Sequence, residues 1–196
     1  MQTEKRLAIF ASGSGTNAEE IFRYFKNHPT IHPALLLSNN PEAYALKRAD
    51  DHGIEAMTFN REEFSDGTVL AHLQRTKVTH LVLAGFLWLV PASLLKAYEG
   101  KVVNIHPALL PSFGGKGMYG MKVHQAVKES GAHETGITIH EVNERYDEGK
   151  IIFQAKCEVL PEDTPETIAK KVHSLEYAYF ARVIESWIED IPLKTV

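Results

Sequence analysis

The chain has 196 residues, of which 44% are hydrophobic and 23% are charged, with both signs of charge scattered along it. This composition is typical of a globular protein and excludes a disordered or fibrous one. The formal net charge of -4 gives no general affinity for nucleic acid or for an acidic membrane, so we expect small-molecule substrates, with any phosphate held locally.

The single cysteine, Cys157, cannot form an internal disulfide, and it lies in a segment of alternating apolar residues. We therefore expect a thiol packed on a strand rather than a nucleophile. The apolar run near the N-terminus is too short, and too soon broken by glycine, for a signal peptide or a membrane-spanning helix. These features predict a cytoplasmic protein with no membrane partner.

Short β-branched and aliphatic runs alternate with helical patterns from one end of the chain to the other. We expect strands at residues 6–11, 34–37, 55–57, 80–84, 102–105, 135–141 and 151–159, and helices at 17–26, 41–52, 66–77, 92–99 and 119–130. Such alternation predicts a mostly parallel sheet that is covered by helices on both faces. The last two strands are joined by a short loop and predict an antiparallel addition at one edge.

A final helix is predicted from a clear start signal: Thr164 can cap it, Pro165 suits its first position and Glu166 complements its dipole. The helix runs to about residue 188, with an apolar stripe formed by Val172, Leu175, Tyr179, Val183 and Trp187. The predicted fold is α/β, a Rossmann-like three-layer sandwich with a mostly parallel sheet, an antiparallel edge strand and a long C-terminal helix. We expect a single domain over residues 1–196.

A glycine-rich turn, Ser12-Gly13-Ser14-Gly15-Thr16-Asn17, follows the first predicted strand. Its backbone N–H groups and the dipole of the next helix favour an anion, so it predicts a phosphate site. The turn also matches the dinucleotide-binding fingerprint, but that fingerprint expects a carboxylate at the end of the second strand, where this chain has Ser38-Asn39-Asn40-Pro41. A tight turn without a ligand is the simpler alternative, and it stays open.

Asn104 and His106 end another predicted strand, and residues two apart in a strand project on the same side. Open α/β sheets place their ligands at such strand ends. Asp147 lies in the loop Tyr146-Asp147-Glu148-Gly149, where a functional carboxylate and a turn-forming aspartate are equally simple readings. A histidine such as His106, taken alone, is more often a satisfied side chain at a strand end, so the hypothesis of a reactive pair depends on contact between His106 and Asp147.

These segments, with Leu83-Ala84-Gly85-Phe86 and with Leu109-Leu110-Pro111 after Asn104-Ile105-His106-Pro107, resemble the formyl-folate transferase family over nearly the entire chain. The Asn-x-His-Pro segment followed by Leu-Leu-Pro is highly specific to that family. Its catalytic trio is Asn, His and Asp, which correspond here to Asn104, His106 and Asp147. Within the family, the phosphate loop favours the branch whose acceptor is a small phosphorylated compound.

The resemblance implies transfer of a formyl group from 10-formyltetrahydrofolate, as co-substrate, to the amine of 5-phosphoribosylglycinamide, in purine biosynthesis. It implies no metal and no covalent enzyme intermediate. Asn104 and a protonated His106 would stabilise the charge that develops on the formyl oxygen. Asp147 would raise the pKa of His106 and pass protons through a water molecule.

The resemblance also assigns binding residues. The acceptor would be held by Gly15, Thr16, Asn17, Gly85, His173 and Glu176, and the pterin by Leu87, Trp88, Leu89, Val90, Asn104, His140, Glu141 and Val142. Glu176 has support of its own, because it falls beside the apolar stripe, where an unpaired carboxylate would be costly. Trp88 stands where many relatives have a basic residue, which leaves the contacts of the folate tail open.

Three other functions compete with this one. A formyltetrahydrofolate hydrolase and a methionyl-tRNA formyltransferase share the family, although both usually carry an extra domain, and the acidic balance argues against tRNA. A non-catalytic nucleotide-binding module would use only the glycine-rich turn. The sequence predicts either a monomer or a homodimer.

Overall fold

The computed structural model describes residues 3–193, and the chain divides between Val103 and Asn104 into two compact units. The strands are hydrogen-bonded in the order β3-β2-β1-β4-β5-β6-β7. The predicted α/β fold, with a mostly parallel sheet, an antiparallel edge and a long C-terminal helix, is confirmed. The single domain over residues 1–196 stays a prediction, and its first two and last three residues lie outside the described chain.

The first unit contains the strands β1 (Lys5–Phe10), β2 (Ile31–Ser38), β3 (Glu55–Thr58) and β4 (His80–Leu83), and it ends within β5 (Val102–His106). Its helices are α1 (Thr16–Phe25), α2 (Tyr44–Asp51), α3 (Arg61–Ser65), α4 (Thr68–Arg75) and α5 (Ala92–Ala97). β1 pairs in parallel with both β2 and β4, and Leu7 to Ala11 are at most 1% exposed. This burial on both faces explains the unbroken apolar run.

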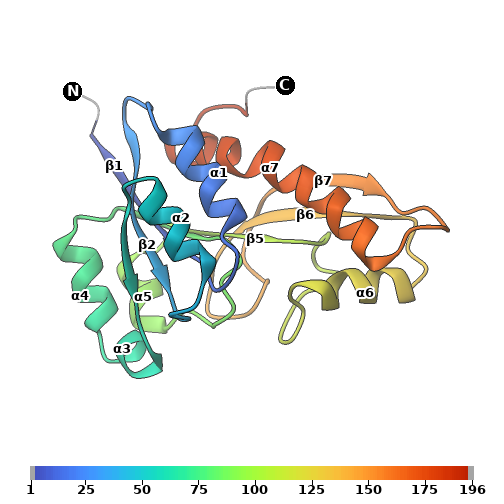
Figure 1. The fold of residues 1–196 in the computed structure, drawn as a ribbon, viewed down its shortest axis with the longest axis horizontal. Helices are drawn as coiled ribbons and strands as arrows, with labels where there is room; N and C mark the ends of the chain where they lie inside the picture. The colour runs from blue at the N-terminus through green and yellow to red at the C-terminus, as the bar shows by residue number, and fades with distance from the viewer. Residues whose placement is uncertain (1–2, 194–196) are drawn as a thin grey trace. The chain divides into compact units, whose positions relative to one another are not determined.

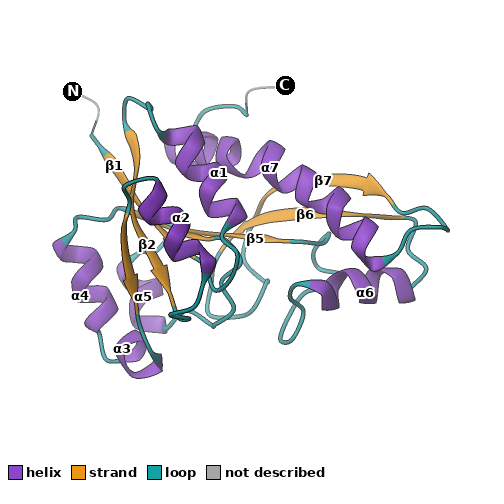
Figure 2. Ribbon diagram, in the orientation of Figure 1, coloured by secondary structure: helices purple, strands orange, loops and turns teal. Residues whose placement is uncertain are grey.

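The chain reverses its direction along the sheet beside β1. From β1 it passes to β2 and then to β3, but from β3 it returns to β4 on the other side of β1. Because such crossovers are right-handed, α1 and α2 cover one face and the helices that follow β3 cover the other. Figure 2 shows α1 and α2 together in front of these strands. The carboxyl ends of β1 and β4 therefore form a topological switch point, where open sheets bind ligands.

The second unit contains α6 (Met121–Glu129), β6 (Glu134–Glu141), β7 (Ile151–Glu158) and α7 (Pro165–Glu189). β6 and β7 pair antiparallel, and α7 lies along both of them (Figure 1). α7 begins where the sequence predicts, because Thr164 and Thr167 form a reciprocal capping box on either side of Pro165. Within residues 3–193, no helix combines the length and the apolar character needed to cross a membrane.

One helix was not predicted. α3 begins at a capping box in which the Asn60 side chain accepts from the Glu63 N–H and the Glu63 carboxylate accepts from the Asn60 N–H. The expected helix at 66–77 starts later, at Thr68, because Gly67 with φ 99° separates it from α3. The Asn-x-x-Glu spacing was a readable signal, but five residues are too few to show an apolar period.

The predicted stripe on α7 is partly wrong. Val172 and Val183 are buried, but Leu175, Tyr179 and Trp187 are only partly so. The buried face instead includes Glu176 and Phe180, so Glu176 lies in the stripe rather than beside it. Apolar residues at spacings of three and four do not stay on one face of a helix of 25 residues, because the stripe drifts around the axis. The predicted stripe therefore included residues at the edge of the buried face and left out Glu176 and Phe180.

The turn between β1 and α1 depends on Gly15, which is the N-cap of α1 and has φ 71°. A Cβ built on Gly15 would come within 2.5 Å of the Ala45 Cβ, so α2 approaches the turn too closely for any side chain. At Gly13, two residues earlier, an added Cβ meets no atom within 4 Å. The turn therefore has no room for a side chain at Gly15 but has room for one at Gly13.

We expect Gly15→Ala to lower the free energy of unfolding by about 2–4 kcal/mol, because it combines a left-handed alanine with a steric overlap. Gly13→Ala should change it by less than about 0.5 kcal/mol. Urea unfolding of both variants and the unchanged protein checks this. Equal effects of the two substitutions would contradict the assignment of strain to Gly15.

Candidate functional site

Four polar side chains form a cluster in the second unit, which we call the His106 cluster: Asn104, His106, His140 and Asp147. Asn104 and His106 come from the end of β5, His140 from the end of β6 and Asp147 from the loop between β6 and β7. His106 is 3% exposed and His140 is 2% exposed. The structure therefore brings the predicted trio together and adds His140, which the sequence assigned only to the pterin.

His106 is oriented by contacts at both ring nitrogens. Its Nε2 lies 2.8 Å from the carbonyl oxygen of Phe113. A carbonyl can only accept, so Nε2 carries the hydrogen and donates it. Nδ1 faces the Asp147 Oδ2 at 3.6 Å. A proton gained by His106 therefore goes to Nδ1 and meets a carboxylate.

Asp147 is held by a backbone donor and by an unusual backbone conformation. Its Oδ2 accepts a hydrogen bond of 2.8 Å from the Gly115 N–H, and its φ of 57° is left-handed. Its Oδ1 lies 3.6 Å from the His140 Nε2. Gly114 leaves room for this packing, since a Cβ there would come within 3.3 Å of the Asp147 Cβ.

His140 fixes the amide of Asn104. The His140 Nδ1 donates to the carbonyl of Glu141 at 2.8 Å, so in the neutral ring Nε2 is an acceptor. The Asn104 Nδ2 donates to that atom at 3.0 Å. His140 therefore determines which way the Asn104 carboxamide points.

The pKa values follow from burial and from charge. Burial opposes ionisation of Asp147, but the neighbouring His140 and His106 and the Gly115 N–H together hold its pKa below 3.8. Burial lowers the pKa of His106 below 6.5, and it outweighs the carboxylate of Asp147, which raises it. The unliganded site thus pairs an ionised Asp147 with a His106 that is mostly neutral near pH 7. The expected protonated state of His106 is not its resting state.

The loop after His106 is clamped by Thr138 and Gln154 of the β6–β7 hairpin, neither of which carries a motif that would single it out in the sequence. The buried Thr138 hydroxyl donates to the Ala108 carbonyl at 2.7 Å and accepts from the Leu110 N–H at 2.9 Å. The Gln154 amide donates to the Leu110 carbonyl at 3.1 Å and to Thr138 at 2.8 Å. The rings of Pro107 and Pro111 also restrict the backbone here, so together with this clamp they fix the loop that leads to Phe113.

In the first unit, the loops after β1, β2 and β4 meet at Ser12. The Ser12 N–H donates to the Gly85 carbonyl at 3.2 Å, and the Ser12 hydroxyl donates to the Asn39 Oδ1 at 2.6 Å. The Leu87 N–H donates to that hydroxyl at 3.1 Å. Asn39 stands where a dinucleotide site would need a carboxylate, and it is used here to hold the glycine-rich turn.

The segment after β4 alternates in exposure. Leu87 and Leu89 are 45% and 42% exposed, whereas Val90 is buried. Trp88 is half-buried, and the Arg61 guanidinium lies 4.3 Å from the centroid of its indole. A positively charged group therefore does lie next to Trp88, but Arg61 supplies it from α3, the helix that the sequence did not predict.

The remaining predicted residues lie on α7 and at the end of β6. Glu176 is 6% exposed, whereas His173 is exposed and stacks against Tyr177 with ring centroids 6.2 Å apart. Glu141 and Val142 are half-buried beside His140. Cys157 is half-buried on β7, and burial raises the pKa of its thiol, which agrees with a packed thiol rather than a nucleophile.

Comparison with known proteins gives the family. Residues 5–184 match the formyl transferase family. Among curated relatives, the chain is 40% identical over 193 residues to the chloroplastic phosphoribosylglycinamide formyltransferase of Arabidopsis thaliana, covering 95% of this chain and 66% of that protein. It is 35% identical over 187 residues to the phosphoribosylglycinamide formyltransferase of Bacillus subtilis, covering 92% and 93%.

The chain spans less than two thirds of the length of its plant relatives, 66% for Arabidopsis and 62% for Vigna unguiculata. Solved structures with the same fold include the phosphoribosylglycinamide formyltransferases of Anaplasma phagocytophilum, with a TM-score of 0.87 and 30% identity over 96% of this chain and 89% of that one, and of Bacillus halodurans, with 0.85 and 36% over 94% and 95%. The match over nearly all of the chain, together with the His106 cluster, shows that this protein belongs to the formyl transferase family.

Proposed function

We propose that the chain transfers a formyl group from 10-formyltetrahydrofolate to the amine of 5-phosphoribosylglycinamide, a step of purine biosynthesis. The single observation that carries the proposal is the His106 cluster, in which a buried amide, an imidazole and a carboxylate converge. The names of the Arabidopsis and Bacillus relatives support the choice of acceptor.

The chemistry of the cluster suits this reaction. The amine attacks the formyl carbon, and negative charge develops on the formyl oxygen of the tetrahedral intermediate. In our proposal, Asn104 donates a hydrogen bond to that oxygen through its second amide hydrogen, and the positive charge of a protonated His106 stabilises it. His106 enters as a neutral ring, and the developing charge raises its pKa, while the nearby Asp147 stabilises the imidazolium that forms. The proton lost by the amine then passes through this pair to the departing folate nitrogen.

Binding roles are proposed for the residues that the family resemblance named. The N-terminus of α1, with Gly15, Thr16 and Asn17, suits the substrate phosphate because it offers backbone N–H groups and a favourable dipole. The proposal gives Gly85 to the amine, and His173 and Glu176 to the ribose. For the pterin it uses Leu87, Trp88, Leu89 and Val90 with Asn104, His140, Glu141 and Val142, and it needs no metal.

The other formyl-folate enzymes are not favoured, because the relatives and structures compared above carry the name of one enzyme. The nucleotide-binding module is not favoured either, because it leaves the His106 cluster without a role. Monomer or homodimer and the cytoplasmic location stay predictions, and the Arabidopsis relative is named as chloroplastic.

Release of tetrahydrofolate tests the function directly. Purified protein is mixed with 10-formyltetrahydrofolate, with and without 5-phosphoribosylglycinamide. We expect release only when the acceptor is present. Release without acceptor would instead identify a hydrolase, and no release in either case would favour the binding module.

The substitution Asp147→Asn removes the charge of the carboxylate and keeps the shape of the side chain. Asparagine tolerates the left-handed backbone at this position and its Oδ1 can still accept from the Gly115 N–H. We expect kcat to fall roughly a hundredfold to ten-thousandfold, with little change in unfolding free energy. Steady-state kinetics and urea unfolding check both parts, and near-normal turnover would remove Asp147 from the mechanism.

We also expect Asp147→Asn to change the pKa of His106. The Asp147 carboxylate raises the pKa of His106, so its loss should move that pKa further below 6.5. Ring ¹³C chemical shifts, followed against pH in the unliganded protein, give the pKa. His80 is the internal control, because its pKa of about 4 is set by burial and by Lys5 and Lys101. An unchanged or raised pKa of His106 would contradict the pairing.

A further inference from the structure

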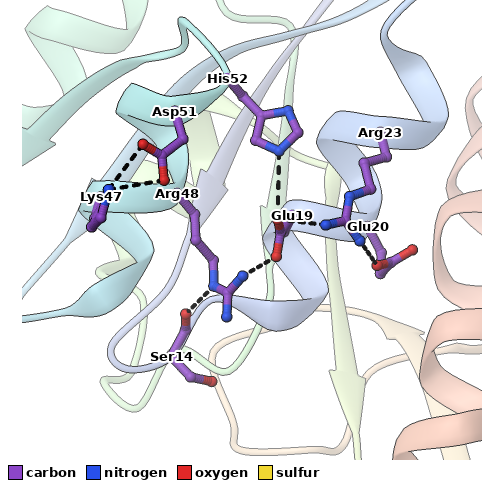
Figure 3. A network of polar contacts seen from close by, with 8 residues as sticks. All are labelled: Ser14, Glu19, Glu20, Arg23, Lys47, Arg48, Asp51 and His52. Atoms are coloured by element: carbon purple, nitrogen blue, oxygen red, sulfur yellow. Dashed lines mark hydrogen bonds and ion pairs between the residues drawn. The ribbon is translucent and has the colours of Figure 1, made fainter.

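Arg48 on α2 connects the glycine-rich turn to α1 (Figure 3). Its Nε donates to the Ser14 carbonyl oxygen at 2.9 Å, and its Nη1 pairs with the Glu19 carboxylate. The side chains of Arg48 and Glu19 are 22% and 16% exposed, so this is a largely buried pair rather than a surface one. Such pairs are geometrically demanding, because both ions have lost most of their water.

The turn is held from the α2 side by two of its carbonyl groups. The Ala45 N–H donates to the Gly13 carbonyl at 3.1 Å, and Arg48 donates to the next carbonyl, that of Ser14. In a trans peptide, the C=O of one residue and the N–H of the following residue point in opposite directions. Fixing these two carbonyls toward α2 therefore directs the N–H groups of Ser14 and Gly15 away from α2.

Arg48 also removes an electrostatic obstacle. Glu19 lies in the first turn of α1, where its charge would repel an anion bound at the start of the helix. Its Oε2 is paired with Arg48, and its Oε1 lies 2.7 Å from Arg23 and 3.6 Å from the His52 Nε2. Two arginines thus compensate this carboxylate, but only Arg48 also binds the turn.

Lysine could not perform both tasks equally well. The Arg48 guanidinium donates through one nitrogen to the turn and through another to Glu19, and its plane lies 4.9 Å from the Tyr44 ring centroid. This use needs a planar fork, whereas an ammonium is a point charge on a flexible stem.

We infer that Arg48 is a positioning residue for the phosphate of the acceptor: it does not contact the substrate, but it orients the amides of the turn and neutralises Glu19. The inference rests on the proposed function, which assigns the phosphate to this turn. Its effect is on recognition of the phosphate, and it leaves the His106 cluster and the folate untouched.

The test compares Arg48→Met and Arg48→Lys with two matched controls, Lys47→Met and Arg23→Met. All three methionine variants remove one positive charge. Lys47 is on the same helix, is 58% exposed and forms an ion pair of 3.0 Å with Asp51. Arg23 shares Glu19 but does not bind the turn. Steady-state kinetics are measured with phosphoribosylglycinamide, with the same acceptor lacking the phosphate, and with varied folate.

We expect Arg48→Met to raise KM for the phosphorylated acceptor roughly tenfold, the factor that about 1.4 kcal/mol gives, with kcat and the folate KM nearly unchanged. The preference for the phosphorylated over the dephosphorylated acceptor, as a ratio of kcat/KM, should fall by the same factor. Arg48→Lys should recover only part of it, and Lys47→Met should behave as the unchanged protein. Arg23→Met should lower the preference by clearly less than Arg48→Met, because it removes one partner of Glu19 but leaves the turn bound. A preference that is unchanged in Arg48→Met, or equally reduced in Arg23→Met, would overturn the inference. If the methionine variant does not fold, the preference of Arg48→Lys decides.

Binding of inorganic phosphate, followed by ³¹P NMR, separates this inference from the proposed function. If the unchanged protein releases no tetrahydrofolate with the acceptor, the proposed function fails. Weaker phosphate binding by Arg48→Met than by the two controls would then still support the positioning role, and equal binding would overturn it.

Discussion

The burial of β1 and its neighbours on both faces is the constraint on which the functional groups depend. A strand such as β1, with its side chains from Leu7 to Phe10 fully buried, has no place for a polar group along its length. Polar chemistry is therefore confined to the ends of the strands. The glycine-rich turn follows β1, Gly85 follows β4, and Asn104 and His106 are the last polar residues of β5.

Near these ends, two carboxylates that are largely withdrawn from water, Asp147 and Glu19, each face more than one polar partner. Asp147 has two histidines and a backbone N–H, and Glu19 has two arginines and a histidine. Ionisation of a buried carboxylate is costly unless such partners are fixed in advance. In both networks a carboxylate is held by several partners, but the result differs. Asp147 stays ionised and acts on His106, whereas the partners of Glu19 neutralise its charge.

The sequence predicted the parts of the molecule that leave a local pattern. The apolar runs predicted the strands, the Thr164-Pro165 signal predicted the start of α7, and Asn104 and His106 lie at the end of a strand, as expected. It did not predict the roles of Thr138, Gln154 or Arg48, because each binds a loop that is 28 or more residues away in the chain. The spacing of apolar residues also placed Glu176 beside the buried face of α7 rather than in it, because a buried acid does not belong to an apolar pattern. The net direction of the His106 pKa could not be predicted for a similar reason: Asp147, which raises that pKa, was visible in the sequence, but the depth of burial, which lowers it, was not.

The clamp formed by Thr138 and Gln154 has a consequence for the order of folding. Its hydrogen bonds join residues 28 and 44 positions apart, so they close large chain loops and cannot form early by local contact. The complete clamp also requires both strands of the β6–β7 hairpin, because Thr138 and Gln154 come from different ones. The loop from Pro107 to Phe113 therefore acquires its final hydrogen bonds only after that hairpin has paired. A chain with β7 detached lacks the Gln154 half of the clamp, so the loop that carries the Phe113 acceptor of His106 is then held by fewer hydrogen bonds.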